Sequence, residues 1–149
     1  MRQIFDDSVY VVNGNNFNTA IVDGNFPAST AYVDVTEFTH FVFLVRVGTL
    51  NSALTLQVKQ DTSATETASI KSVTGATLVI AADDDNEIKS IEVESAKLDL
   101  ANGFRYVTLA VSGAGGGDDY LDVLFLGRLP RRMPVTQSAA YSEAVVIAG

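Results

Sequence analysis

Residues 38–58 read FTHFVFLVRVGTLNSALTLQV, and this stretch decides the fold class. From Phe41 to Val47 every second residue is a large apolar one: Phe41, Phe43, Val45 and Val47. Beyond Gly48, the segment 54–58 alternates Leu and Val with Thr and Gln. Alternation with a period of two is typical of a β-strand that packs one face on a core. The stretch therefore predicts two strands joined by a turn.

The same alternation recurs along the rest of the chain. It predicts further strands near residues 9–12, 32–35, 78–80, 90–94, 106–111 and 120–126, with a less regular candidate at 65–73. Turn residues separate them, at Gly75, 83–86, 102–103 and 113–119. No apolar repeat of helical period extends over three turns, and only residues 95–100 favour a single helical or 3₁₀ turn. About eight or nine short strands indicate an all-β fold, an antiparallel β-sandwich of jelly-roll-like type with extended terminal arms.

Composition narrows the function classes. The 149 residues suffice for a single domain, and the absence of Cys excludes disulfides and thiolate chemistry. The net charge of −8 argues against direct binding of nucleic acid, which requires clustered positive charge. The sequence has no run of 18 apolar residues and no signal-like start, so we expect no membrane contact and synthesis in the cytoplasm.

Two predicted strands are apolar on both faces for part of their length, at Phe41–Val45 and Val123–Leu126. One interpretation is that both are central strands with loops over the outer face. The other is that the second face meets another subunit, because soluble monomers rarely expose a large apolar patch.

The domain organisation follows from a change in composition after Gly127. We expect residues 1–37 to form an N-terminal ribbon and the first strands, and residues 38–127 to form the sandwich core of the same domain. Residues 128–149, with two Pro and three Arg, predict an extended C-terminal arm that could reach about 70 Å at about 3.3 Å per residue. Such an arm either stays loose or gains backbone hydrogen bonds by adding a strand to a sheet edge, for which residues 144–148 are the candidate.

No set of residues predicts catalysis. His40 stands alone as the one His, and the glycine-rich segment 113–117 lacks the Lys and the following helix of a phosphate-binding loop. The acidic turn 83–87 leaves calcium binding open, as does the pair Asp118–Asp119, although neither has the spacing of a calcium loop. We therefore predict a protein that is not an enzyme and has no cofactor.

Three stretches carry a resemblance to a known class of proteins: FVFLVRVGTLNSALTLQVKQD, DDDNEIKSIEVESAKLDLANGFRYVTLAVS and YLDVLFLGRLPRRMPVTQ. In their order and texture they resemble small virion proteins of tailed bacteriophages, of the capsid decoration (cement) or minor head protein type. The resemblance implies a β-rich subunit of the virion that assembles as an oligomer, often a homotrimer. It also implies binding to the major capsid protein, with terminal arms that lock neighbouring capsomers.

The resulting prediction is a capsid decoration protein that works through interfaces. The residues predicted to form them are Phe41, Phe43, Leu124, Leu126, Arg128, Arg131, Arg132, Val145, Val146 and Ile147. Alternatives are another virion role, such as a jelly-roll coat subunit or a head–tail or fibre component. A carbohydrate-binding module is a further alternative, with Tyr106 and Tyr120 as its candidate aromatic pair.

Overall fold

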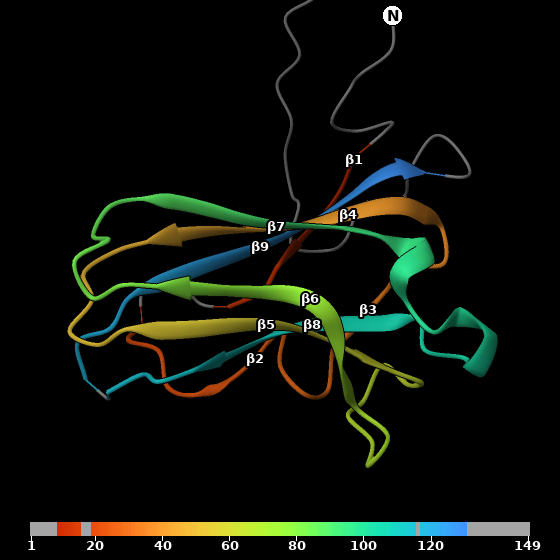
Figure 1. Ribbon diagram of the computed structural model, residues 1–149, viewed down its shortest axis with the longest axis horizontal. Helices are drawn as coiled ribbons and strands as arrows, with labels where there is room; N and C mark the ends of the chain where they lie inside the picture. Colours follow the sequence, from red (N-terminus) through yellow and green to blue (C-terminus); the bar gives the residue numbers. More distant parts are fainter. Residues whose placement is uncertain (1–8, 16–18, 116, 131–149) are drawn as a thin grey trace, which may run out of the picture.

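The computed structural model describes residues 9–15, 19–115 and 117–130, and it is a sandwich of two antiparallel sheets (Figure 1). The first sheet has the order β1 (Val9–Asn13), β9 (Leu121–Pro130), β4 (Phe38–Val47), β7 (Ile88–Glu94). The second has the order β2 (Gly24–Phe26), β8 (Tyr106–Ser112), β5 (Leu54–Asp61), β6 (Lys71–Ile80), and β3 (Val33–Asp34) also pairs with β8. The predicted all-β antiparallel sandwich is confirmed.

The strand pairing is that of a jelly roll. β1 pairs with β9, β2 with β8, β4 with β7 and β5 with β6, so the first half of the chain pairs with the second half in reverse order. This nesting is what results when one long antiparallel hairpin wraps into two sheets. The short β3 is an addition to that scheme.

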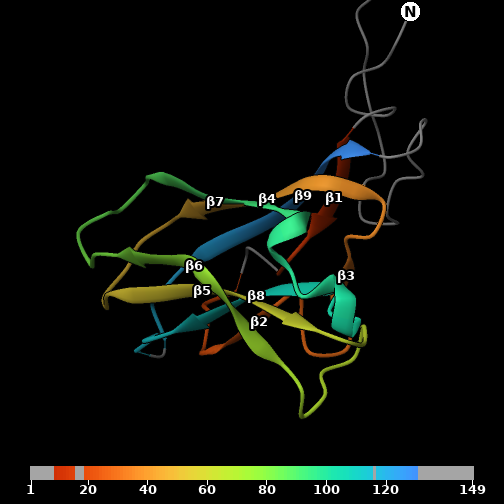
Figure 2. The ribbon, with the colours of Figure 1, turned by 45° about the vertical axis from the view of Figure 1, so that its right-hand side comes forward.

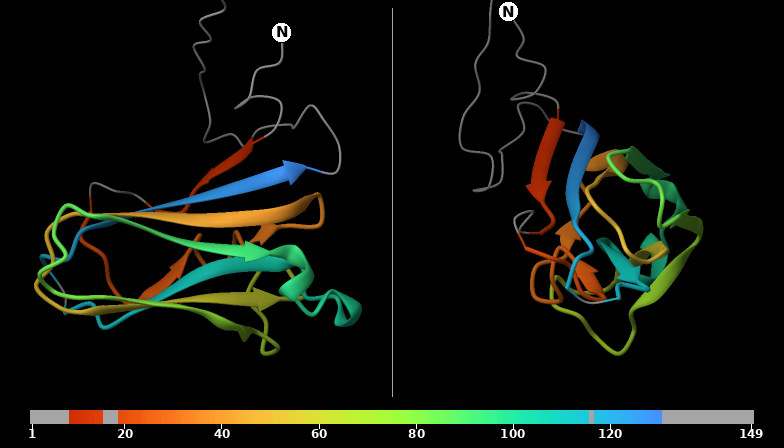
Figure 3. Two further views of the ribbon diagram at one scale, coloured as in Figure 1. Left: turned by 45° about the horizontal axis from the view of Figure 1, so that its top comes forward. Right: turned by 90° about the vertical axis from the view of Figure 1, so that its left-hand side faces the viewer.

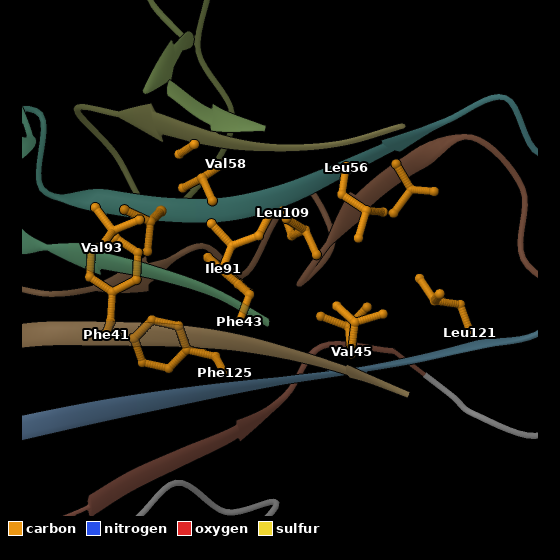
Figure 4. Close-up of a cluster of buried hydrophobic side chains, with 14 of the residues drawn as sticks. Phe41, Phe43, Val45, Leu56, Val58, Ile91, Val93, Leu109, Leu121 and Phe125 are labelled. Carbon is orange, nitrogen blue, oxygen red and sulfur yellow. The ribbon is translucent and has the colours of Figure 1, made fainter. Parts of the chain in front are cut away.

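The core lies between the sheets and is built from the fully apolar row of β4. Phe41, Phe43 and Val45 point inward together with Phe125 of β9, and all four side chains are completely buried (Figure 4). The Phe125 ring stacks on Phe41 with centroids 5.7 Å apart and meets Phe43 edge-on at 5.5 Å. Aromatic pairs in these geometries add to the stabilisation from burial alone.

Several local predictions need correction. β2 was not predicted, because its sequence Gly-Asn-Phe is typical of a turn. Gly75 does not separate two strands, since it lies inside β6 in the left-handed region at φ 80°. β6 therefore joins the predicted strand 78–80 to the last three residues of the candidate 65–73 in one strand of 10 residues. The expected single turn at 95–100 is present as two 3₁₀ turns, η1 (Ser95–Lys97) and η2 (Leu100–Asn102).

The expected first strands near 9–12 and 32–35 are present as β1 and β3, whereas the predicted start of the C-terminal arm shifts. The N-terminal region contributes β1 to the first sheet and β2 and β3 to the second, so its described part is integral to the sandwich. β9 continues through Pro130, which places Arg128 in a strand rather than in an arm. In the part of the chain that the structure describes, no helix has the length and apolar character needed to cross a membrane.

The loops gather at the two ends of the sandwich (Figure 3). One end carries the connections 48–53, 81–87 and 113–120, and the other carries 62–70 and the two 3₁₀ turns. Phe38 at the start of β4 pairs with Pro130 at the end of β9, so the described chain ends at the second of these ends.

Candidate interaction surface

The outward side of the first sheet carries a contiguous apolar surface. Val42 lies opposite Leu126 and Leu44 opposite Leu124 across β4 and β9, and Val11 of β1 lies opposite Leu126. These residues alternate with the inward row of the same strands, so they point away from the core. The Val42 side chain is 9% exposed, and the other four side chains are half-buried. We call these five residues the apolar outer face.

Charged residues border the apolar outer face at both ends of the strands and along β7. At one end His40 lies opposite Arg128, and at the other Arg46 lies opposite Asp122, with 3.8 Å between the Arg46 Nη1 and Asp122 Oδ2 atoms. Along β7, Glu92 lies opposite Val42 and Glu94 lies opposite His40. The Glu94 Oε1 atom is 3.7 Å from the His40 Nε2 atom. An apolar centre inside a charged rim is the usual anatomy of a protein–protein interface.

The outward side of the second sheet is different in kind. Its central strand β5 presents Thr55, Gln57 and Lys59 outward, and Thr77 of β6 lies opposite Gln57. The Gln57 amide donates to the Val73 and Ala76 carbonyl oxygens at 3.0 and 3.1 Å and accepts from the Thr77 hydroxyl. We call Thr55, Gln57, Lys59 and Thr77 the polar outer face, and within it Gln57 makes its hydrogen bonds inside the sheet.

Some of the predicted interface residues lie on the apolar outer face, and some do not. Leu124, Leu126 and Arg128 point outward from β9. Phe41 and Phe43 do not form an exposed surface, because both are 0% exposed between the sheets. The remaining predicted residues, Arg131, Arg132, Val145, Val146 and Ile147, lie outside the described residues.

Sequence reasoning left Val42 and Leu44 out of the interface, although a signal for them exists. The row Phe41, Phe43, Val45 is wholly apolar and therefore belongs to the core, which leaves the mixed row of β4 as the outward one. β4 and β9 are both central strands, as the first interpretation of their doubly apolar pattern required. The outward side chains of β4 and β9 form one surface because the register places Val42 opposite Leu126 and Leu44 opposite Leu124.

Three carboxylates of the acidic turn 83–87, those of Asp84, Asp85 and Glu87, are engaged in bonds of the fold. Asp84 accepts from the Ala81 N–H at 3.0 Å and lies 3.1 Å from the Lys89 Nζ atom, which also pairs with Glu87. The Ala81 bond and the Lys89 ammonium lower the pKa of Asp84 below its ordinary value. Asp85 accepts from the Leu50 N–H at 2.8 Å. Among the described residues, no group of three metal-ligating side chains has the geometry to hold an ion.

Two buried carboxylates fasten the loops at opposite ends of the sandwich. Asp119, 1% exposed, accepts N–H groups of Asn51 and Gly115 at 2.7 Å each and a third from Ser52 at 3.2 Å. Asp61, 0% exposed, accepts from the N–H and the hydroxyl of Thr67. Burial alone would raise the pKa of both carboxyls, but the hydrogen bonds outweigh it and lower each pKa below its ordinary value. Both carboxylates thus hold loops in place.

The tyrosine pair proposed for carbohydrate binding does not share a surface. Tyr106 begins β8 and lies opposite Asp61, at the end of the sandwich that carries the 3₁₀ turns. Tyr120 precedes β9 and its carbonyl oxygen accepts from the Gly48 N–H, at the other end. The two rings therefore cannot stack on one sugar.

Comparisons with known proteins add nothing to this geometry. The chain matches no protein-family model, no curated protein and no solved structure. The functional argument therefore rests on the surface itself.

Proposed function

We propose that this protein is a structural component of a tailed-bacteriophage virion, a capsid decoration (cement) protein. In this role it associates with its own copies, as a trimer, and with the major capsid protein. It is made in the host cytoplasm and resides in the capsid. The proposal assigns it no catalytic role, no cofactor and no direct contact with nucleic acid or membrane.

The observation that carries the proposal is the apolar outer face. Five aliphatic side chains lie together on the solvent side of the first sheet, while the central strand β5 of the second sheet presents Thr55, Gln57 and Lys59 on the corresponding side. Burying such a surface against a partner releases about 25 cal/mol for each Å² removed from water. A protein that works by being covered by neighbours is the simplest account of this asymmetry.

Two further points support the virion assignment. The three sequence stretches that resemble phage virion proteins form most of β4 and all of β5, β7, β8 and β9, so the resemblance covers four of the five residues of the apolar outer face, those on β4 and β9. The jelly roll is a fold that viral capsid domains use, although it also hosts unrelated functions and so supports the assignment only by analogy.

The self-association is tested by polarising the apolar outer face. The double variant Leu44→Thr/Leu126→Thr keeps residues that favour strands but removes two large apolar side chains from the centre of the face. We expect native mass spectrometry at micromolar concentration to find an oligomer for the parent protein and a monomer for this variant. Val79→Thr is the matched control, because Val79 is 64% exposed on the outward side of β6. A parent protein that is monomeric under these conditions contradicts the proposal.

The capsid role is tested by counting copies per particle. Phage particles purified from the host that carries this sequence are analysed by quantitative mass spectrometry. We expect copies on the order of hundreds, as a shell-covering subunit needs, and loss of the protein from particles carrying the Leu44→Thr/Leu126→Thr variant. About a dozen copies or fewer would instead indicate a head–tail or fibre component, and absence from the particles would refute a virion role. The double variant also distinguishes a decoration protein from a coat subunit. If the protein is a decoration protein, particles still assemble when the variant fails to bind them, whereas loss of a coat subunit would prevent assembly.

A further inference from the structure

A second surface lies on the open side of the sandwich, where both sheets end. β7 is the last strand of the first sheet and β6 the last of the second, and the two strands contact each other there (Figures 2 and 3). Between them runs a groove of about 360 Å³ whose floor includes Val73, Ala76, Ile91 and Val93. Glu92, Glu94 and Lys97 line its rim. The groove offers apolar contacts beside an exposed strand.

The two edge strands differ in how they are protected. β6 is irregular, because its register against β5 shifts between the partners of Gln57 and Lys59, around Gly75. Such a bulge twists an edge away from further pairing. β7 pairs in continuous register with β4 over 7 positions. Within the described ranges it pairs with no other strand, so one row of its backbone groups has no strand partner.

Lys89 protects only the first part of the β7 edge against pairing with a further strand. It lies opposite Val45 in the register and so on the inward side, where its amine pairs with Asp84 and Glu87 of the adjacent turn. A charge on the inward side of an edge strand opposes the addition of another strand. The protected part therefore ends at Lys89, and the five residues 90–94 beside the groove lack this device.

We infer that residues 144–148 of a second copy add as a strand to the β7 edge at 90–94 and insert alternate side chains into the groove. The segment reads AVVIA, which matches the free edge in length, contains no Pro or charge, and is rich in β-branched residues. Added strands of this kind bind through backbone hydrogen bonds and side-chain pockets together. The inference rests on the proposed function, since it supplies the contact by which arms bridge neighbours.

The position of the chain's described end fits this contact. β9 ends at Pro130, at the same end of the sheet as Glu94, because Pro130 lies opposite Phe38 and Glu94 opposite His40. The 13 residues from 131 to 143 span about 43 Å when extended at about 3.3 Å each. That length exceeds the diameter of about 35–40 Å expected for a domain of this size, so the segment can reach a neighbouring copy.

The test uses disulfide formation in a protein that has no Cys of its own. Full-length Glu92→Cys is mixed separately with Val145→Cys, Val146→Cys and Ile147→Cys, and mixed dimers are identified by intact mass after mild oxidation. Because side chains of a strand alternate between faces, we expect cross-linking either at 146 or at 145 and 147, several-fold above the other class. Thr55→Cys, exposed on the polar outer face, replaces Glu92→Cys as the control and should give no such pattern.

Two outcomes overturn the inference. Equal yields at the three arm positions, or yields no higher than with Thr55→Cys, would exclude an added strand. Cross-linking that occurs only within a Glu92→Cys/Val146→Cys double variant, without mixed dimers, would place the segment on its own chain. If either outcome is found while the Leu44→Thr/Leu126→Thr variant still abolishes the oligomer, the inference fails and the proposed function stands. A parent protein without any oligomer refutes the proposed function instead.

Discussion

The outward sides of the two sheets are built from strands of similar length and pairing, yet they meet solvent differently. On the second sheet, Gln57 bonds to the irregular part of β6, and the Thr108 hydroxyl donates to the Pro27 carbonyl oxygen at 2.8 Å. On the first sheet, Leu44, Leu124 and Leu126 occupy the corresponding central positions and have no polar group to bond. These polar side chains of the second sheet bond within the protein, whereas the first sheet presents a cluster of partly exposed aliphatic side chains that a partner can cover.

Apolar residues on one strand therefore have two roles, packing in the core and forming the outward surface. Phe125 of β9 faces the core and contacts Phe41 and Phe43, while the next residue, Leu126, faces outward. Stability of the fold depends on the inward row and, in our proposal, association depends on the outward row. Substitutions at adjacent positions should therefore have opposite profiles.

The largest effect is expected when these adjacent residues are exchanged for Ala. Phe125→Ala should lower the free energy of unfolding by about 3–5 kcal/mol, because it leaves a cavity among packed rings. Leu126→Ala should cost about 1 kcal/mol, since the side chain is only partly buried. Urea unfolding followed by circular dichroism measures both, at a concentration below that of association.

In an association assay the ranking of the two variants should be reversed, with the larger loss of association in Leu126→Ala. Leu126→Ala should weaken the oligomer seen by native mass spectrometry, whereas Phe125→Ala should keep it wherever the protein remains folded. Equal loss of association in both variants would show that the apolar outer face has no role separate from stability.

Much of the fold was predictable because period-two alternation is a local property. The faces of β4, β5, β8 and β9 follow from it directly. β2 was missed because Gly24 and Asn25 favour turns, and only their pairing with β8 makes them a strand. Gly75 was misplaced for the same reason, since a bulge in a strand and a turn between strands use the same residue.

The candidate surface was predictable only in part. The doubly apolar pattern located the two strands and the wholly apolar row of β4 indicates its core side, but which outward rows meet in one surface requires the pairing partners. The alignment of Val42 with Leu126 comes from register between strands far apart in sequence. The groove beside β7 depends on which strands are edges, and strand order cannot be obtained from alternation alone.

A smaller effect on stability, with none on association, is expected at the loop end. Asp119→Asn replaces one carboxylate oxygen with an NH₂ group, so at least one N–H among Asn51, Ser52 and Gly115 loses its acceptor. The expected cost is about 1–3 kcal/mol in urea unfolding. Asp118→Asn is the control, because Asp118 is exposed. Oligomer mass should be unchanged in both variants, which separates stability from association a second time.

The pH dependence gives this variant its own signature. The folded-state pKa of Asp119 lies below the ordinary value of 3.8, so its contribution to stability is complete above that value and is lost as the pH falls through the folded-state pKa. The difference in unfolding free energy between the parent protein and Asp119→Asn, about 1–3 kcal/mol at neutral pH, should therefore shrink as the pH falls below 3.8 and through the folded-state pKa. A difference that stays constant with pH would mean that the carboxylate charge is not what holds the loops.

The smallest effect concerns the polar outer face itself. Gln57→Ala removes the amide that donates to the Val73 and Ala76 carbonyl oxygens, so the free energy of unfolding should fall by about 1 kcal/mol. Thr55→Ala, at an exposed position of the same strand, should change it by less than about 0.5 kcal/mol. Neither should alter the oligomer, because in our proposal this face meets only solvent. A loss of association in Gln57→Ala with Thr55→Ala unaffected would mean that the irregular part of β6, rather than the first sheet alone, shapes the contact between copies.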